Sequence, residues 1–195
     1  MNDQYKQRHG PQKSDKIKFY QGTFSPIHPE KCLTNKNIYR SFWEFQFMQW
    51  CDRNPSIIRW ASEPIGIPYL NPVDNLEYCM KHNLDPNNPA NWKKCTYYTD
   101  FWIEIQDQTK PDGFKRIFIE IKPYAQTQCP KPVNEAATLK EHKRYNKDAQ
   151  TYLINSSKWQ AAAKYFHERG AEFMVITEKT LESLGLTLSV KNYNK

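Results

Sequence analysis

The chain lacks any long apolar run. Hydrophobic residues make up only 38% of its 195 residues, and no stretch approaches the roughly 18 consecutive apolar residues that a membrane-spanning helix needs. No apolar segment of the signal-peptide kind follows Met1. We therefore expect no membrane insertion, and we expect a protein of a reducing compartment.

Cysteine is present but forms no regular framework. The five cysteines are an odd number without a repeated spacing, which favours free thiols over a disulfide scaffold. His28 with Cys32, and Cys79 with His82, have the spacing of zinc ligands. Both pairs lie in Pro-rich segments without tight ligand knuckles, so chance explains the spacing better and no zinc site is expected.

Positive charge and aromatic side chains are what the chain has in excess. Its 28 Lys and Arg residues outnumber 21 Asp and Glu, which gives a net charge of +7, and aromatics reach 14%. A basic surface suits a polyanionic partner such as nucleic acid, although many basic proteins bind none. With few aliphatic residues, the core must depend on Trp, Tyr and Phe.

The length fits a single domain with one insertion. Residues 1–27 are rich in Lys, Gln, Asp and Gly and predict a basic arm that is mobile until it meets a partner. The folded domain is expected over residues 28–186, with a Pro- and Asn-rich insertion at about 71–94 and a tail at 187–195.

Hydrophobic periodicity predicts an α/β fold in which helices flank a mixed sheet. The insertion is expected to hold at most a short helix near residues 76–82. The other predicted elements are a helix with an aromatic face at 39–51, capped by Asn35 or Asn37, strands at 57–60 and 64–70, a β-hairpin formed by 97–105 and 116–123, polar and amphipathic helices at 135–153 and 157–169, a strand at 171–176 and a short helix at 180–184.

The hairpin carries the chemistry. The Lys110–Gly113 turn separates two apolar strands, which carry the acidic residues Asp100 and Glu120 among apolar and aromatic neighbours. A buried carboxylate is costly unless a cation or partner neutralises it. Lys122 follows Glu120 by two residues, so both side chains point to the same face of a strand. The alternative is an amphipathic hairpin whose carboxylates face solvent and pair with Lys122.

These residue types suit metal-assisted hydrolysis of a phosphodiester. Asp100, Glu120 and the backbone carbonyl of Ile121 are oxygen ligands of the kind that Mg²⁺ prefers. Lys122 could polarise the attacking water or neutralise charge that develops on the phosphoryl group.

Four motifs follow one another along the chain: Tyr-Arg-Ser-Phe-Trp-Glu at 39–44, Tyr-Tyr-Thr-Asp-Phe at 97–101, Ile-Glu-Ile-Lys-Pro at 119–123 and Lys-Trp-Gln-Ala-Ala at 158–162. In this order they resemble the motifs of the PD-(D/E)XK nuclease superfamily, which has the restriction-endonuclease-like fold. More narrowly, they resemble those of head completion nucleases of contractile-tailed bacteriophages and of a transposon end-cutting endonuclease subunit. The resemblance implies that Glu44 joins the metal ligands, that Gln160 is a further polar residue near them, and that Mn²⁺ can replace Mg²⁺. Thr99 stands where the superfamily name has Pro.

The resemblance implies a DNA endonuclease that processes or secures the packaged end of double-stranded DNA before the tail is joined. It places the protein in the phage head or neck, with portal or neck proteins as partners, and in the host cytoplasm during assembly. Two alternatives remain open: a structural DNA-gripping plug of the portal with an idle nuclease site, and a transposition-type endonuclease. The basic cluster of the first polar helix is either a solvated helix face or a contact to the DNA backbone; it consists of Lys140, Lys143, Arg144 and Lys147.

Overall fold

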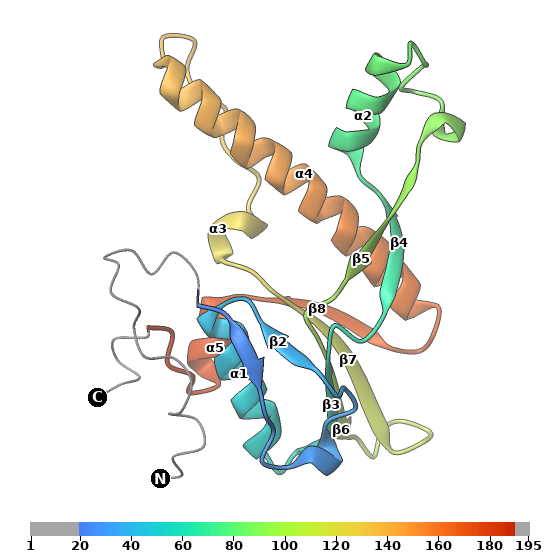
Figure 1. The fold of residues 1–195 in the computed structure, drawn as a ribbon, viewed down its shortest axis with the longest axis vertical. Coiled ribbons are helices and arrows are strands. Elements are labelled where there is room, and N and C mark those ends of the chain that lie inside the picture. The colour runs from blue at the N-terminus through green and yellow to red at the C-terminus, as the bar shows by residue number, and fades with distance from the viewer. Residues whose placement is uncertain (1–19, 190–195) are drawn as a thin grey trace.

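A computed structural model describes residues 20–189 of the chain (Figure 1). Most of the predicted basic arm and the end of the predicted tail lie outside these residues. The strands are β1 (Gly22–Phe24), β2 (Asn37–Tyr39), β3 (Ile57–Ser62), β4 (Gly66–Leu70), β5 (Lys94–Tyr98), β6 (Phe101–Gln106), β7 (Phe114–Ile121) and β8 (Glu172–Ile176). The helices are η2 (Pro29–Lys31), α1 (Phe42–Arg53), α2 (Pro72–Lys81), η3 (Pro89–Asn91), α3 (Tyr124–Thr127), α4 (Leu139–His167) and α5 (Glu178–Ser183).

The central sheet is mixed, with strand order β3-β6-β7-β8. The β6–β7 hairpin is antiparallel and sets Ile103 opposite Ile117, whereas β8 runs parallel to β7. The predicted hairpin and the predicted fold class, a single α/β domain with a mixed sheet between helices, are therefore confirmed. No helix within residues 20–189 is both long and apolar enough to cross a bilayer.

Alternation along β7 sends its side chains to two different cores. Ile117, Ile119 and Ile121 join the main core with aromatic residues of α1 and with Leu181 of α5. Phe118 faces the opposite side, where its ring stacks on Phe166 of α4 at a centroid distance of 3.6 Å. Glu120 follows Phe118 by two residues, and so β7 delivers this carboxylate to the α4 side of the sheet.

Helix α1 begins at Phe42 because Ser41 caps it, the hydroxyl accepting a hydrogen bond from the backbone of Glu44. The prediction that Asn35 or Asn37 caps this helix is wrong, because Asn37 begins β2, which pairs with β1. The predicted aromatic face does lie in the main core, through Phe42, Phe45 and Phe47.

The segment expected to be one strand, 97–105, is two strands that belong to different sheets. β5 pairs with β4 in a separate two-stranded sheet, while β6 belongs to the central one. The chain bends at Thr99 and Asp100, where the Asp100 carbonyl accepts a hydrogen bond from the backbone of Glu63 at 3.0 Å. Propensity alone gives no sign of this bend, because the residues on both sides favour strands.

The insertion forms part of a projecting arm, which we define as residues 66–98, comprising β4, α2, η3 and β5 (Figure 1). Helix α2 is longer than the predicted one: Asn71 caps it and Pro72 occupies its first turn. The projecting arm packs on the C-terminal half of α4 through Ile67 and Tyr97, which share a small apolar cluster with Ala162.

The two helices predicted at 135–153 and 157–169 are one helix of 29 residues, α4. Ser157 does not cap a second helix: its hydroxyl donates to the carbonyl of Leu70 in β4 at 2.6 Å. Most residues of the first half of α4 are exposed to solvent, so this half lacks an apolar periodicity although the helix does not break. Thr138 and Glu141 form the capping box, and Gly170 with φ of 68° follows the end of the helix.

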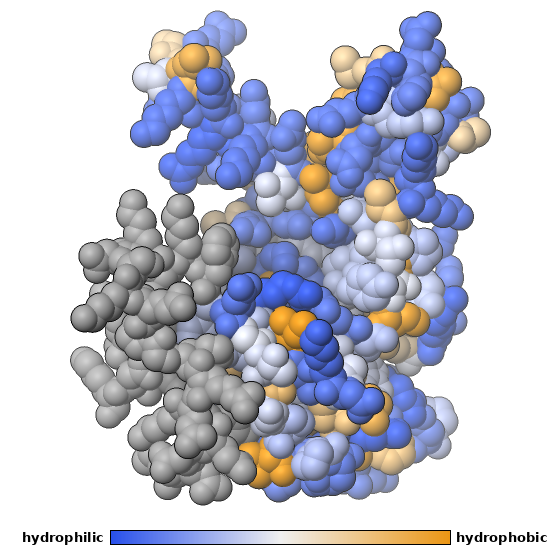
Figure 2. Space-filling view, viewed as in Figure 1, coloured by the Kyte–Doolittle hydropathy of each residue, from blue (hydrophilic) through white to orange (hydrophobic). Residues whose placement is uncertain are grey.

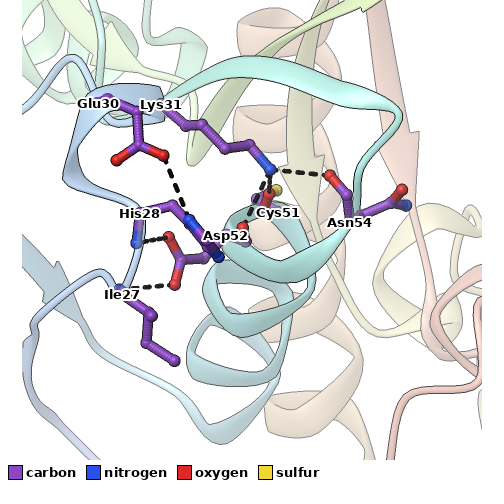
Figure 3. Close-up of polar contacts among 7 residues, drawn as sticks. All are labelled: Ile27, His28, Glu30, Lys31, Cys51, Asp52 and Asn54. Atoms are coloured by element: carbon purple, nitrogen blue, oxygen red, sulfur yellow. Dashed lines mark hydrogen bonds and ion pairs between the residues drawn. The ribbon is translucent and has the colours of Figure 1, made fainter.

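The mobile arm was predicted through residue 27, and its last part is instead folded. β1 pairs with β2, and Phe24 is buried in the main core. Figure 3 shows how the next residues join α1: the Asp52 carboxylate accepts from the backbone of Ile27 and His28, while the Lys31 ammonium donates to three carbonyls at the end of the helix. Residues 22–28 are therefore part of the folded domain, and residues 1–19 of the predicted N-terminal arm lie outside the described residues.

Candidate active site

Three of the predicted site residues meet where β7 ends. One oxygen of Asp100 accepts a hydrogen bond from the backbone N–H of Ile121 at 2.7 Å. The Lys122 ammonium lies 2.6 Å from Oε1 of Glu120. Lys122 is itself anchored, because its backbone N–H donates to Ile176 of β8 at 3.0 Å. Two strands thus hold two carboxylates and one ammonium in a single place.

Burial makes this place electrostatically costly. Desolvation raises the pKa of Asp100 from 3.8 to about 7, and the nearby Glu120 adds to the rise, while Lys122 and the Ile121 N–H oppose it. Desolvation by itself would lower the pKa of Lys122, but Asp100 and Glu120 outweigh it, and the pKa of the ammonium is raised. The site therefore favours an additional positive charge.

The donor set fits a hard divalent cation. Its atoms are the carboxylate oxygens of Asp100 and Glu120 and the carbonyl of Ile121, all oxygens. The Lys122 ammonium balances the charge of Glu120, against which it lies, and donates a hydrogen bond to the Ile121 carbonyl at 3.4 Å. Within residues 20–189, no three His, Cys, Asp or Glu side chains are grouped closely enough to hold a metal on their own.

Glu44 lies near this group but points at its own helix. Its carboxylate accepts from the backbone N–H of Arg40 at 2.7 Å and from the Ser41 hydroxyl at 2.9 Å, and the same hydroxyl accepts from the backbone N–H of Glu44. It still contributes to the raised pKa values of Asp100 and Lys122. Glu44 is thus a neighbour of the predicted metal ligands whose oxygens are engaged at the start of α1.

Gln160 lies exposed on α4, and no contact within the described part of the chain joins its side chain to the carboxylates. The α4 side chain that approaches the site is Lys158, whose ammonium lies 5.6 Å from the ring centroids of both Tyr69 and Tyr97. Lys158 was within a recognised motif, but sequence alone gave no reason to prefer it to Gln160.

The sequence did not predict that Tyr97 contacts Glu120. Its hydroxyl donates to Oε2 of Glu120 at 2.6 Å, and both side chains are buried. Desolvation, together with Glu120, raises the pKa of Tyr97, so the hydroxyl remains a donor. The Tyr97 ring is packed in the small apolar cluster beside α4.

The basic cluster predicted to contact DNA is exposed on the N-terminal half of α4. This half extends away from the central sheet, and its surface is largely hydrophilic (Figure 2). Arg144 and Lys147 line a hollow of about 690 Å³ between α4 and the connection that follows α3, together with Lys131 and Tyr152. Lys140 and Lys143 lie on the same half of the helix, outside the hollow.

The residues with zinc-ligand spacing are divided between distant parts of the fold. His28 lies beside the end of α1 and contacts Glu30, and Cys32 bridges to β3. Cys79 is buried in α2, and His82 follows at the end of that helix in the projecting arm. All five cysteines are free thiols.

Comparisons with known proteins give the family of the chain. Residues 54–178 match the family model described as TnsA-like endonuclease N terminal. The chain belongs to this family, and the protein is an endonuclease. It is also 36% identical over 169 residues to the head completion nuclease of Enterobacteria phage T4, an alignment that covers 85% of this chain and 96% of the relative. The relationship expected from the four motifs is confirmed.

Proposed function

We propose that the protein is a divalent-metal-dependent DNA endonuclease that acts in phage head completion, where it processes or secures the packaged DNA end before tail attachment. The observation that carries the proposal is the juxtaposition of Asp100, Glu120 and Lys122 in a desolvated place at the end of β7. The similarity to the T4 head completion nuclease supports the biological setting.

Each residue has a distinct part in this proposal. Asp100, Glu120 and the Ile121 carbonyl hold Mg²⁺ or Mn²⁺, which supplies a nucleophilic water and neutralises the phosphoryl oxygens. The Ile121 N–H orients Asp100. Lys122 presents a fixed positive charge to the negative charge that develops on the scissile phosphate. Glu44 completes the set from α1, after its carboxylate leaves the helix cap.

The exposed basic half of α4 suits the DNA backbone. Its side chains are long, solvated and arranged along a helix that begins far from the sheet and ends beside Tyr97, so phosphates bound along it would lead toward the catalytic carboxylates. The hollow beside Arg144 and Lys147 has room for part of a single DNA strand. Gln160 stands exposed on the same helix, available to DNA.

The catalytic proposal is tested with Glu120→Gln, which keeps an acceptor for Tyr97 but removes the charge. Linear and supercoiled DNA are incubated with wild type and variant in Mg²⁺, in Mn²⁺ and in EDTA. Wild type should cut only with metal, and Glu120→Gln should not cut. The control is Glu77→Gln on the exposed part of α2. Cutting by Glu120→Gln at the wild-type rate would refute the assignment.

The DNA-binding proposal is tested by single substitutions to Ala on the α4 face. Each lost phosphate contact should weaken binding of any sequence and reduce the slope of log affinity against log salt by about 0.9. Lys81→Ala, on α2, is the matched control. An unchanged slope in every variant would leave the face as a solvated helix surface. The substituted residues are Lys140, Lys143, Arg144 and Lys147.

The assembly role is tested in infected cells. A phage that carries Glu120→Gln should accumulate DNA-filled heads that fail to yield infectious particles, with the variant protein present in the head or neck alongside portal and neck proteins. Normal particle yield with the inactive enzyme would favour the structural alternative, in which the protein grips DNA at the portal without cutting it.

A further inference from the structure

We infer that Tyr97 is a positioning residue that fixes the orientation of the Glu120 carboxylate, and that the projecting arm contributes to the active site by supplying it. The inference rests on the proposed metal-dependent cleavage for its kinetic consequence. It goes beyond that proposal because Tyr97 belongs to the two-stranded β4–β5 sheet and not to the central sheet that carries Glu120.

The two oxygens of Glu120 have different partners. Oε2 accepts the Tyr97 hydroxyl at 2.6 Å, and Oε1 faces the Lys122 ammonium at 2.6 Å. With one partner on each oxygen, the plane of the carboxylate is fixed. Glu120 is 3% exposed and Tyr97 is 5% exposed, so water has little access to replace the hydroxyl. The hydrogen bond to Tyr97 is therefore the restraint on the Oε2 side.

Tyr97 can impose this orientation because its own ring is immobilised. It lies opposite Ile67 in the β4–β5 pairing, and its ring meets the Tyr69 ring nearly edge-on at a centroid distance of 6.3 Å. Ala162 and Phe166 of α4 complete the cluster around it. A phenol held on several sides is a directional donor, unlike a mobile surface hydroxyl.

The orientation matters for the proposed reaction because it determines which oxygen is available. With Oε2 held by Tyr97, Oε1 is the oxygen on the side of the Lys122 ammonium, which also contacts the Ile121 carbonyl, and the cation is proposed beside these groups. Without the hydroxyl, the carboxylate can rotate. Loss of a residue that orients a ligand typically reduces metal affinity or activity by about 10- to 100-fold.

The variant that tests the inference is Tyr97→Phe, which removes one hydroxyl and preserves the packed ring. The control is Tyr69→Phe, which removes a hydroxyl from the same cluster without touching Glu120. Calorimetric titration with Mn²⁺, without DNA, should give an affinity about 10- to 100-fold weaker for Tyr97→Phe and unchanged for Tyr69→Phe. In steady-state cleavage, kcat at fixed metal should fall while KM for DNA stays the same.

A metal-independent readout separates this inference from the proposed function. In metal-free protein labelled with ¹³C at glutamate side chains, the carboxyl resonance that disappears in Glu120→Gln should shift in Tyr97→Phe and stay in place in Tyr69→Phe. An unmoved resonance, or equal loss of metal affinity in both Tyr variants, overturns the positioning role. A shifted resonance in a protein that neither binds metal nor cuts DNA would uphold the contact and refute the function.

Discussion

Asp100→Asn should stabilise the metal-free protein while abolishing cleavage, and the gain should depend on pH. In the folded protein, burial raises the pKa of Asp100 from 3.8 to about 7. Between about pH 4 and pH 7, the Asp100 carboxyl is therefore protonated in the folded state and ionised in the unfolded state. Because the folded state binds the extra proton, the stability of wild type falls as the pH rises through this range. Asn cannot ionise, and its oxygen can still accept the Ile121 N–H.

The size of the effect follows from the shift. A difference of about 3 pKa units corresponds to about 4 kcal/mol for the fully ionised carboxylate, reached above pH 7. Between pH 5 and pH 8, the free energy of unfolding of Asp100→Asn should rise relative to wild type by about 2–3 kcal/mol. Asp100→Asn also loses the attraction between Asp100 and Lys122. This loss shifts the difference in unfolding free energy between the two proteins by a similar amount at each pH, so it alters the pH dependence of that difference less.

The assay is urea unfolding, followed by circular dichroism in EDTA, at pH 5, 6, 7 and 8 for both proteins. Groups that titrate alike in the two proteins cancel in the difference. Saturating Mg²⁺ at about 100 times its dissociation constant should then stabilise wild type by about 2.7 kcal/mol and leave Asp100→Asn unchanged. A stability difference that is the same at every pH would refute the electrostatic account of this site.

Lys122→Met should abolish cleavage at saturating metal, while its affinity for Mn²⁺ should equal that of wild type or exceed it. The reason is that the wild-type ammonium lies against two of the groups that are proposed to bind the metal. Weaker Mn²⁺ binding by calorimetry would show that Lys122 organises the site instead. Glu44→Ala should cost about 1 kcal/mol in urea unfolding through the hydrogen bonds lost to Arg40 and Ser41, whereas Glu44→Gln should retain stability but lose cleavage. Full activity of Glu44→Gln would restrict Glu44 to stabilising the start of α1. Lys31→Met loses three hydrogen bonds to the end of α1 and should cost about 1–3 kcal/mol in urea unfolding with an unchanged cleavage rate. Slower cutting by the folded Lys31→Met protein would contradict a purely structural role.

Local patterns in the sequence determined the hairpin and the side on which its charges meet. Turn residues between two apolar runs place β6 beside β7, and the two-residue spacing alone brings Lys122 to Glu120, because strand geometry alternates faces. Periodicity likewise located the buried face of α1, and Gly170 marked where α4 ends. These features depend on residues close together in the chain.

Only the tertiary structure decided which distant residues complete the site. The bend at Asp100 divides an apparently continuous strand between two sheets, and this division carries Tyr97 to Glu120. The uninterrupted α4 directs Lys158 toward the tyrosine cluster and leaves Gln160 exposed, since packing against the arm sets the rotation of the helix. Such contacts join segments that are far apart in sequence, and no local propensity encodes their register.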